Sequence, residues 1–256
     1  MTWFPLFLHL FALGTAGSVA AVPPRPIGRY YFKFHMTVVL VMVTVAVLVG
    51  KPWSGEGGLA ARAGALVFAG VILAENVLVR AAKGDLSRGA LLLPVAAGLP
   101  FVTVTALAGA GYGVDQALLL VLHLYTAAAV LGTSLVAMST GHWYLANAAL
   151  PFDILVRLCR LFVAAILAKA LVSGIYAVVG AEEIRRLEPF DLMVLGVRAA
   201  AGLLLAGLLG FMSLACAKRK ANQSATGILY VAVVFVLIGE TISLYLTFRA
   251  RGAVPI

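Results

Sequence analysis

Nine ionisable or amide side chains lie inside the long apolar runs of this chain, where they are candidates for chemistry. Placing an ionisable group in lipid hydrocarbon costs about 3 kcal/mol on membrane-insertion scales, so each is expected to serve a purpose. Imidazole rings can ligate a metal or pass a proton, and carboxylates can relay protons. One set is expected toward the outer half of the membrane: His9, His123, Lys169, Arg198 and Glu240. The other is expected toward the cytoplasmic half: His35, Glu75, Asn76 and His142.

Haem ligation is one interpretation of the four histidines, because neutral imidazole is a common haem ligand. His9 and His123 would ligate an outer haem b iron, and His35 and His142 an inner one. His123 and His142 are 19 residues apart, which is about 28 Å along a helix and long for direct electron exchange. A single outer haem is therefore the simpler variant. His35 and His142 also fit interfacial rings of an aromatic belt.

A quinone site on the cytoplasmic side is the second interpretation. A quinone head group needs a hydrogen-bond donor for its carbonyls and a carboxylate or imidazole that relays protons. The segment GHWYLAN supplies His142, Trp143 and Tyr144 together, and Glu75 and Asn76 are expected at similar depth. These residues therefore form a predicted quinone site that does not depend on paired histidines.

The outer set allows the same chemistry, with His9, His123 and Glu240 as quinone-binding residues. A purely structural interpretation instead joins the buried cations to carboxylates as ion pairs. In that case Lys169 and Arg198 pair with Glu240 or Asp191. The residue types alone leave both interpretations open.

The elements that position these residues are predicted to be transmembrane helices. The 256-residue chain is 63% hydrophobic and 11% charged, whereas a soluble domain is near half apolar and a quarter charged. About 20 apolar residues form a helix that crosses a bilayer. Eight runs qualify, and the first lacks the positive start of a signal peptide. They are residues 3–22, 36–50, 63–80, 89–109, 116–140, 154–180, 190–216 and 226–248. The predicted fold is an all-α, polytopic integral membrane protein.

The basic residues predict the orientation of these spans. The net charge of +9 comes from residues between apolar runs, which is typical of membrane-protein loops and argues against a nucleic-acid partner. The odd-numbered connections hold eleven Lys and Arg residues and the even-numbered ones hold four. The positive-inside rule therefore places the odd connections in the cytoplasm and both termini outside a cytoplasmic (inner) membrane.

A weak internal similarity suggests two halves within the single transmembrane domain, 1–256. The segments PLFLHLFALGTAGS (5–18) and LLVLHLYTAAAVLGTS (119–134) share a His-Leu-aromatic core. They contain His9 and His123 and open the first and fifth spans. The predicted half-repeats are residues 1–114 and 115–250, as parallel four-helix units.

The segment 196–248 resembles the last two spans of the dimethyl sulfoxide reductase membrane anchor, a member of the polysulfide-reductase and nitrite-reductase membrane-subunit superfamily. The points of likeness are Arg198 early in its span, a short polar loop and Gly239-Glu240 before an aromatic helix end. The resemblance implies a quinone-binding membrane subunit docked on an iron–sulfur subunit and a catalytic one. The residues around Glu75 do not match well enough to carry over the family's acidic quinone residue. His9 and His123 have no place in that pattern, which keeps the haem alternative open.

These observations predict a membrane subunit of a respiratory electron-transfer complex that binds quinone or quinol. It would exchange electrons with a partner iron–sulfur or cytochrome subunit and would have no complete active site of its own. One alternative is a membrane cytochrome that binds haem b, and another is a structural anchor. A third is a small secondary transporter, with kinked helices at Pro94 and Pro100 and with His123, Lys169 and Glu240 as proton or substrate sites.

Overall fold

The computed structural model describes residues 3–51, 58–82, 87–107, 114–146, 150–151 and 153–249. Within these ranges the chain is almost entirely helical and contains no strand. Eight helical segments are long and apolar enough to cross a membrane, which confirms the predicted all-α polytopic fold. They are α1 (Trp3–Ala20), α3 (Arg29–Gly50), α4 (Leu59–Ala81), α5 (Arg88–Leu107), α6 (Val114–Ala146), α7 (Asp153–Val179), the combined segment Pro189–Lys218 and α11 (Asn222–Arg249).

The seventh span is built from three pieces. α9 (Pro189–Val197) begins with a proline in its first turn, where the missing N–H costs no helical bond. It continues into a π-helical segment, η1 (Arg198–Leu205), and then into α10 (Ala206–Lys218). Two short helices, α2 (Pro24–Ile27) and α8 (Ala181–Arg185), lie in connections. None of these irregularities follows from hydropathy.

The fifth span differs from its predicted length, and the fourth contains the two prolines at which kinks were predicted. α5 is one helix with Pro94 and Pro100 inside it. α6 has 33 residues rather than the expected 25, so it is about 50 Å long and exceeds a hydrocarbon core of about 30 Å. Its last turns include His142, so this residue is helical. The side chain of His142 is exposed.

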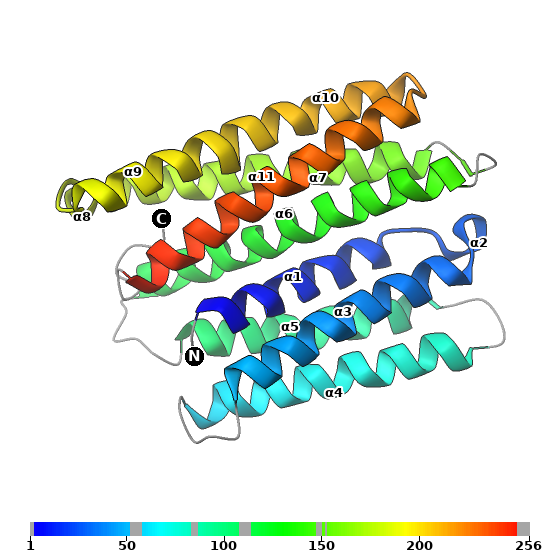
Figure 1. Cartoon of the computed structure of the whole chain (residues 1–256). Helices are drawn as coiled ribbons and strands as arrows, with labels where there is room; N and C mark the ends of the chain where they lie inside the picture. The colour runs from blue at the N-terminus through cyan, green and yellow to red at the C-terminus, as the bar shows by residue number, and fades with distance from the viewer. Residues whose placement is uncertain are drawn as a thin grey trace.

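The helices pack as two sets of four. We call α1, α3, α4 and α5 the N-terminal bundle, and α6, α7, the α9–η1–α10 span and α11 the C-terminal bundle. In each set the first helix packs against the second and fourth, and the third packs against both of those. The sets appear in Figure 1 as the blue-to-cyan and the green-to-red halves. α1 begins and α11 ends at the same end of the molecule, as eight spans require.

The bundles meet along a seam between α1 and α6, where two glycines allow the backbones to touch. A Cβ on Gly14 would lie 1.7 Å from the carbonyl oxygen of Ala128, and a Cβ on Gly132 would lie 1.8 Å from the carbonyl carbon of Gly14. Small residues at such crossings are typical of membrane helices, because close packing replaces the hydrophobic effect there. The seam therefore fixes how α1 and α6 are rotated.

Candidate functional site

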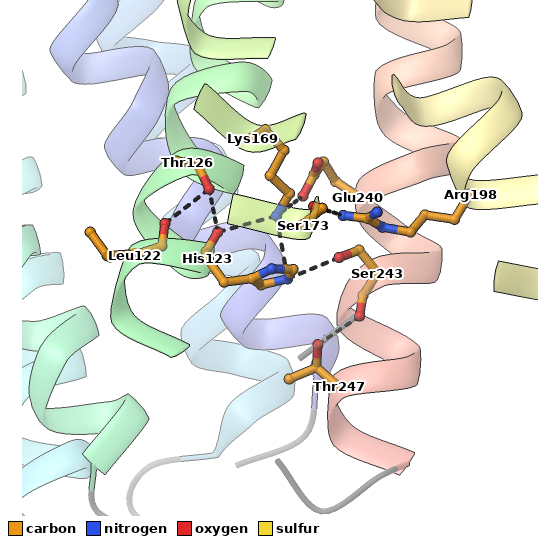
Figure 2. A network of polar contacts seen from close by, with 9 residues as sticks. All are labelled: Leu122, His123, Thr126, Lys169, Ser173, Arg198, Glu240, Ser243 and Thr247. Atoms are coloured by element: carbon orange, nitrogen blue, oxygen red, sulfur yellow. Dashed lines mark hydrogen bonds and ion pairs between the residues drawn. The ribbon is translucent and has the colours of Figure 1, made fainter. Parts of the chain in front are cut away.

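A cluster of buried polar side chains lies in the core of the C-terminal bundle, and we call it the Lys169 cluster. Its members come from all four spans of that bundle, so no single helix could form it. Figure 2 shows these side chains converging between the helices. The cluster consists of His123 on α6, Lys169 and Ser173 on α7, Arg198 on η1, and Glu240 and Ser243 on α11.

Lys169 is at the centre of the cluster and has no exposed surface. Its Nζ lies 3.0 Å from Glu240 Oε2 as a buried ion pair. The same Nζ donates a hydrogen bond of 3.1 Å to the carbonyl oxygen of His123 and lies 3.3 Å from His123 Nε2. Because an ammonium group has three protons, these three contacts use its donor capacity fully.

The contacts of His123 assign its tautomer. Nε2 lies 2.9 Å from Ser243 Oγ and 3.3 Å from Lys169 Nζ. An ammonium group can only donate, so Nε2 is the acceptor and the proton of the neutral ring is on Nδ1. Nδ1 is buried and has no hydrogen-bond partner among the described residues. His123 therefore offers one unused donor inside the bundle.

Arg198 adds a second buried cation to the cluster. Its Nη2 donates a 2.7 Å hydrogen bond to Ser173 Oγ, while Nε is buried without a partner in the described part of the chain. Figure 2 shows the guanidinium group pointing toward Ser173 and Glu240. A Cβ on Gly202, one turn later in η1, would lie 2.5 Å from the Cα of Gly239. This close approach brings η1 against the part of α11 that carries Glu240.

The core of the N-terminal bundle contains Glu75 in a different setting. The residue is 1% exposed, and both carboxylate oxygens are buried without a partner among the described residues. The buried residues of α4 around it are mostly apolar, including Phe68, Ile72 and Val79. The adjacent Asn76 uses its Oδ1 to accept a 2.8 Å hydrogen bond from Arg80. Among the described residues, Glu75 therefore has no counter-charge comparable to Lys169.

His9 also lies in the N-terminal bundle, against α4 and α5. Its Nδ1 donates to the carbonyl oxygen of Pro5 at 2.7 Å, which leaves Nε2 as a buried acceptor without a partner in the described ranges. The ring stands edge-on to Phe101, with centroids 4.8 Å apart, and lies 6.0 Å from Phe68. His9 is thus surrounded by aromatic rings.

His142, Trp143 and Tyr144, the three neighbours in the segment GHWYLAN, point in different directions. Consecutive residues on a helix are about 100° apart around its axis. His142 is exposed, with its Nδ1 3.2 Å from the hydroxyl of Tyr230. Trp143 packs edge-on against Tyr31, at 5.7 Å between centroids. Tyr144 is buried and donates to the carbonyl oxygen of Pro151. His142 therefore does not share the buried setting of Glu75, and Trp143 and Tyr144 contact other partners.

The proposed haem pairs do not face one another either. His9 turns toward α4 and α5, whereas His123 turns toward α7 and α11 in the other bundle. His35 uses both ring nitrogens, donating to the carbonyl oxygen of Tyr31 at 2.8 Å and accepting from Ser139 Oγ at 2.7 Å. One iron between two imidazoles needs a free nitrogen on each ring, directed at the same point. His9 Nε2 and His123 Nδ1 are both without a partner among the described residues but belong to different bundles, so haem ligation by this pair stays a prediction of the sequence.

The sequence interpretation grouped His123, Lys169, Arg198 and Glu240 by depth and by their possible ion pairs, and the structure brings all four into one cluster, with Arg198 joined to it through Ser173. It did not identify Ser173 or Ser243. Both were detectable in principle, because Ser173 follows Lys169 by four residues and Ser243 follows Glu240 by three. Those spacings place side chains on one helix face. The structure contains the Lys169–Glu240 ion pair that the structural interpretation predicted. Asp191 pairs with Arg249, at 3.1 Å, rather than with Lys169 or Arg198.

In the described part of the chain, no group of three or more His, Cys, Asp or Glu side chains is arranged to hold a metal ion. Comparisons with protein-family models, curated proteins and solved structures found no match to this chain. The chemistry of the Lys169 cluster therefore carries the functional argument.

Proposed function

We propose that this protein is the membrane subunit of a respiratory electron-transfer complex and that the Lys169 cluster binds the head group of a quinone or quinol. The observation that carries the proposal is the unused Nδ1–H donor of His123, which is buried beside Lys169 and Glu240. A donor without a partner in lipid costs free energy, so a ligand with an acceptor oxygen is expected there.

The residues of the cluster fit the needs of a quinone. His123 can donate to a carbonyl oxygen, and Glu240 can hold or release a proton next to it. Lys169 keeps Glu240 in place and supplies a compensating charge. A quinone contributes two-electron, two-proton chemistry when bound, while the chain orients it and manages the protons. The hydrocarbon-like surroundings keep bulk water out.

The resemblance to the dimethyl sulfoxide reductase anchor supports the same site. Its two marker positions, Arg198 and Gly239-Glu240, belong to η1 and α11, and both side chains point into the Lys169 cluster. Under this proposal the protein lies in the cytoplasmic membrane with both termini outside. Its basic connections then face the cytoplasm.

Quinone binding by the purified chain in lipid nanodiscs tests the proposal. We expect a water-soluble quinol analogue to quench tryptophan fluorescence saturably, and His123→Phe to weaken its binding by up to about tenfold, the equivalent of one hydrogen bond. The matched control is His142→Ala, because His142 is exposed and contacts only the hydroxyl of Tyr230 among its described partners. Absence of saturable binding, or equal weakening by both variants, would contradict the proposal.

The spectrum of the same sample distinguishes the cytochrome alternative. Sharp visible α-bands on reduction would show that the chain binds haem and would favour the cytochrome alternative over the quinone site. Gentle isolation of the native complex would identify the partner subunit, and the proposal requires one that contains an iron–sulfur cluster or haem.

A secondary transporter is the second candidate, favoured by a buried ion pair between spans of one four-helix half. In that role the ion pair would open during transport, and Glu240 or Lys169 would bind a proton or the substrate in place of the other. Counterflow of a solute by the lone chain in proteoliposomes, abolished by Glu240→Gln, would favour transport over quinone chemistry.

A further inference from the structure

The Lys169 cluster contains more positive than negative charge. Lys169 and Arg198 are cations, His123 is neutral by its contacts, and Glu240 is the one carboxylate of the cluster. Asp191, at the start of the same span as Arg198, is engaged by Arg249 at 3.1 Å. An unbalanced charge inside lipid is expensive unless an ion of opposite sign neutralises it.

The unused hydrogen-bonding capacity of the cluster points the same way. Both unpartnered nitrogens of the cluster are donors, namely His123 Nδ1–H and Arg198 Nε–H. Among the acceptors, Nε2 of His123 faces Ser243 and Lys169, and Oε2 of Glu240 is paired with the charge of Lys169 but accepts no hydrogen bond from the described residues (Figure 2). A ligand that brings acceptor oxygen satisfies these donors, whereas a cation or a second donor would be repelled.

From charge and donor count together, we propose that the Lys169 cluster binds an anion: a ligand with a negatively charged oxygen on an apolar body, recognised by Arg198 and His123. This inference rests on the proposed function in one respect. If the ligand is a quinone, the inference selects quinones that carry an ionised hydroxyl group on the ring. The guanidinium group is the residue type suited to the task, since it stays charged and offers several donors in a plane.

Paired ligands that differ in charge and by a single methyl group test the inference. The probes are a 2-hydroxy-3-alkyl-1,4-naphthoquinone, whose hydroxyl is ionised at neutral pH, and its neutral 2-methoxy counterpart. Binding to the full chain in nanodiscs is measured by fluorescence quenching and by the shift of the thermal unfolding midpoint. The wild-type protein is expected to bind the anion about tenfold more tightly, which corresponds to one additional charge-assisted contact.

Three variants locate the preference. Arg198→Gln is expected to bind both naphthoquinones equally, and Arg198→Lys to retain most of the preference because the charge remains. Ser173→Ala keeps Arg198 but removes the hydroxyl that holds its Nη2, so the preference should fall by a smaller factor. This variant also keeps the test decisive if Arg198→Gln does not fold. The matched control is Arg185→Gln, an exposed arginine in the connection before α9.

The outcomes separate this inference from the proposed function. Equal affinity for the two naphthoquinones in the wild-type protein, or a preference unchanged in both Arg198→Gln and Ser173→Ala, would overturn anion binding and leave quinone binding intact. If neither naphthoquinone binds but dodecanoate raises the unfolding midpoint through Arg198, the anion site is supported and the quinone function fails. If none of these ligands binds, both are overturned.

Discussion

The two bundles have the same helix arrangement, but their buried charges are compensated differently. In the N-terminal bundle, Glu75 and His9 leave acceptor atoms unused among aromatic and aliphatic side chains. In the C-terminal bundle, Lys169 and Glu240 neutralise each other, and His123 and Arg198 each leave a donor nitrogen unused beside that ion pair. Packing of four helices therefore does not determine the chemistry of the core. The difference lies in which charged residues the inward faces carry, and it predicts that substitutions in the two bundles have unequal effects.

The largest effect is expected from Glu240→Gln, which leaves Lys169 and Arg198 without a counter-charge. Breaking a buried ion pair by removing one partner costs about 3–5 kcal/mol of the free energy of unfolding. Reversible unfolding by SDS in mixed micelles, followed by circular dichroism, measures the change. Glu182→Gln is the control, because its pair with Arg185 is exposed on both sides. Equal costs for the two variants would mean that the Lys169 cluster is not an electrostatic unit.

The seam between the bundles should respond next, through sterics rather than charge. Gly14→Val places a side chain where the backbone of Ala128 already lies, so α1 and α6 must separate. Overpacking of this kind costs about 1–3 kcal/mol. The same SDS titration measures it, with Gly70→Val on α4 as the control, since a Cβ there meets nothing within 4 Å. A Gly14→Val protein as stable as the control would show that the bundles are not joined at this crossing.

A smaller effect is expected where α3 bonds to α6 across the bundles. The hydroxyl groups of Tyr31 and Thr140 are 2.7 Å apart, and Tyr31→Phe removes this hydrogen bond while keeping the ring. Hydrogen bonds between membrane helices are worth about 0.6 kcal/mol on average. A double-mutant cycle of Tyr31→Phe with Thr140→Val isolates the coupling. Zero coupling would contradict the contact.

The smallest effect is expected from Glu75→Gln, the isosteric counterpart of the first substitution. Because neither oxygen of Glu75 has a partner among the described residues, no protein contact is lost. The free energy of unfolding should stay within about 0.5 kcal/mol of the wild-type value, as for changes that break no named interaction. A loss as large as that of Glu240→Gln would show that Glu75 has a counter-charge, and the contrast between the bundles would disappear.

The spans were predictable because their cause is local. A bilayer demands a continuous apolar run whose backbone bonds to itself, and eight such runs are visible in the sequence. The lengths were less predictable: α6 continues through His142, since hydropathy marks where lipid ends but not where a helix does. The π-helical turn at Arg198 and the short helices α2 and α8 also have no signature in hydropathy.

The candidate site was predictable only as a list of residues. Depth along a span follows from counting residues, and it grouped His123 with Lys169, Arg198 and Glu240. Depth also grouped His9 with them, although His9 lies in the N-terminal bundle and packs against Phe101 there. It grouped His142 with Glu75, which lie in an exposed and a buried setting respectively. Which way a side chain points depends on the rotation of its helix, and that is set by the neighbours against which it packs.

The sequence by itself determined that this chain has eight apolar spans and that charged residues fall within them. Those properties depend on the length and composition of each segment. Only the tertiary structure decided that His123, Lys169, Arg198 and Glu240 share one core while Glu75 and His9 belong to another. The physical reason is that contacts between helices depend on close backbone approaches, such as Gly14 on Gly132 and Gly202 on Gly239, which join residues far apart in the chain.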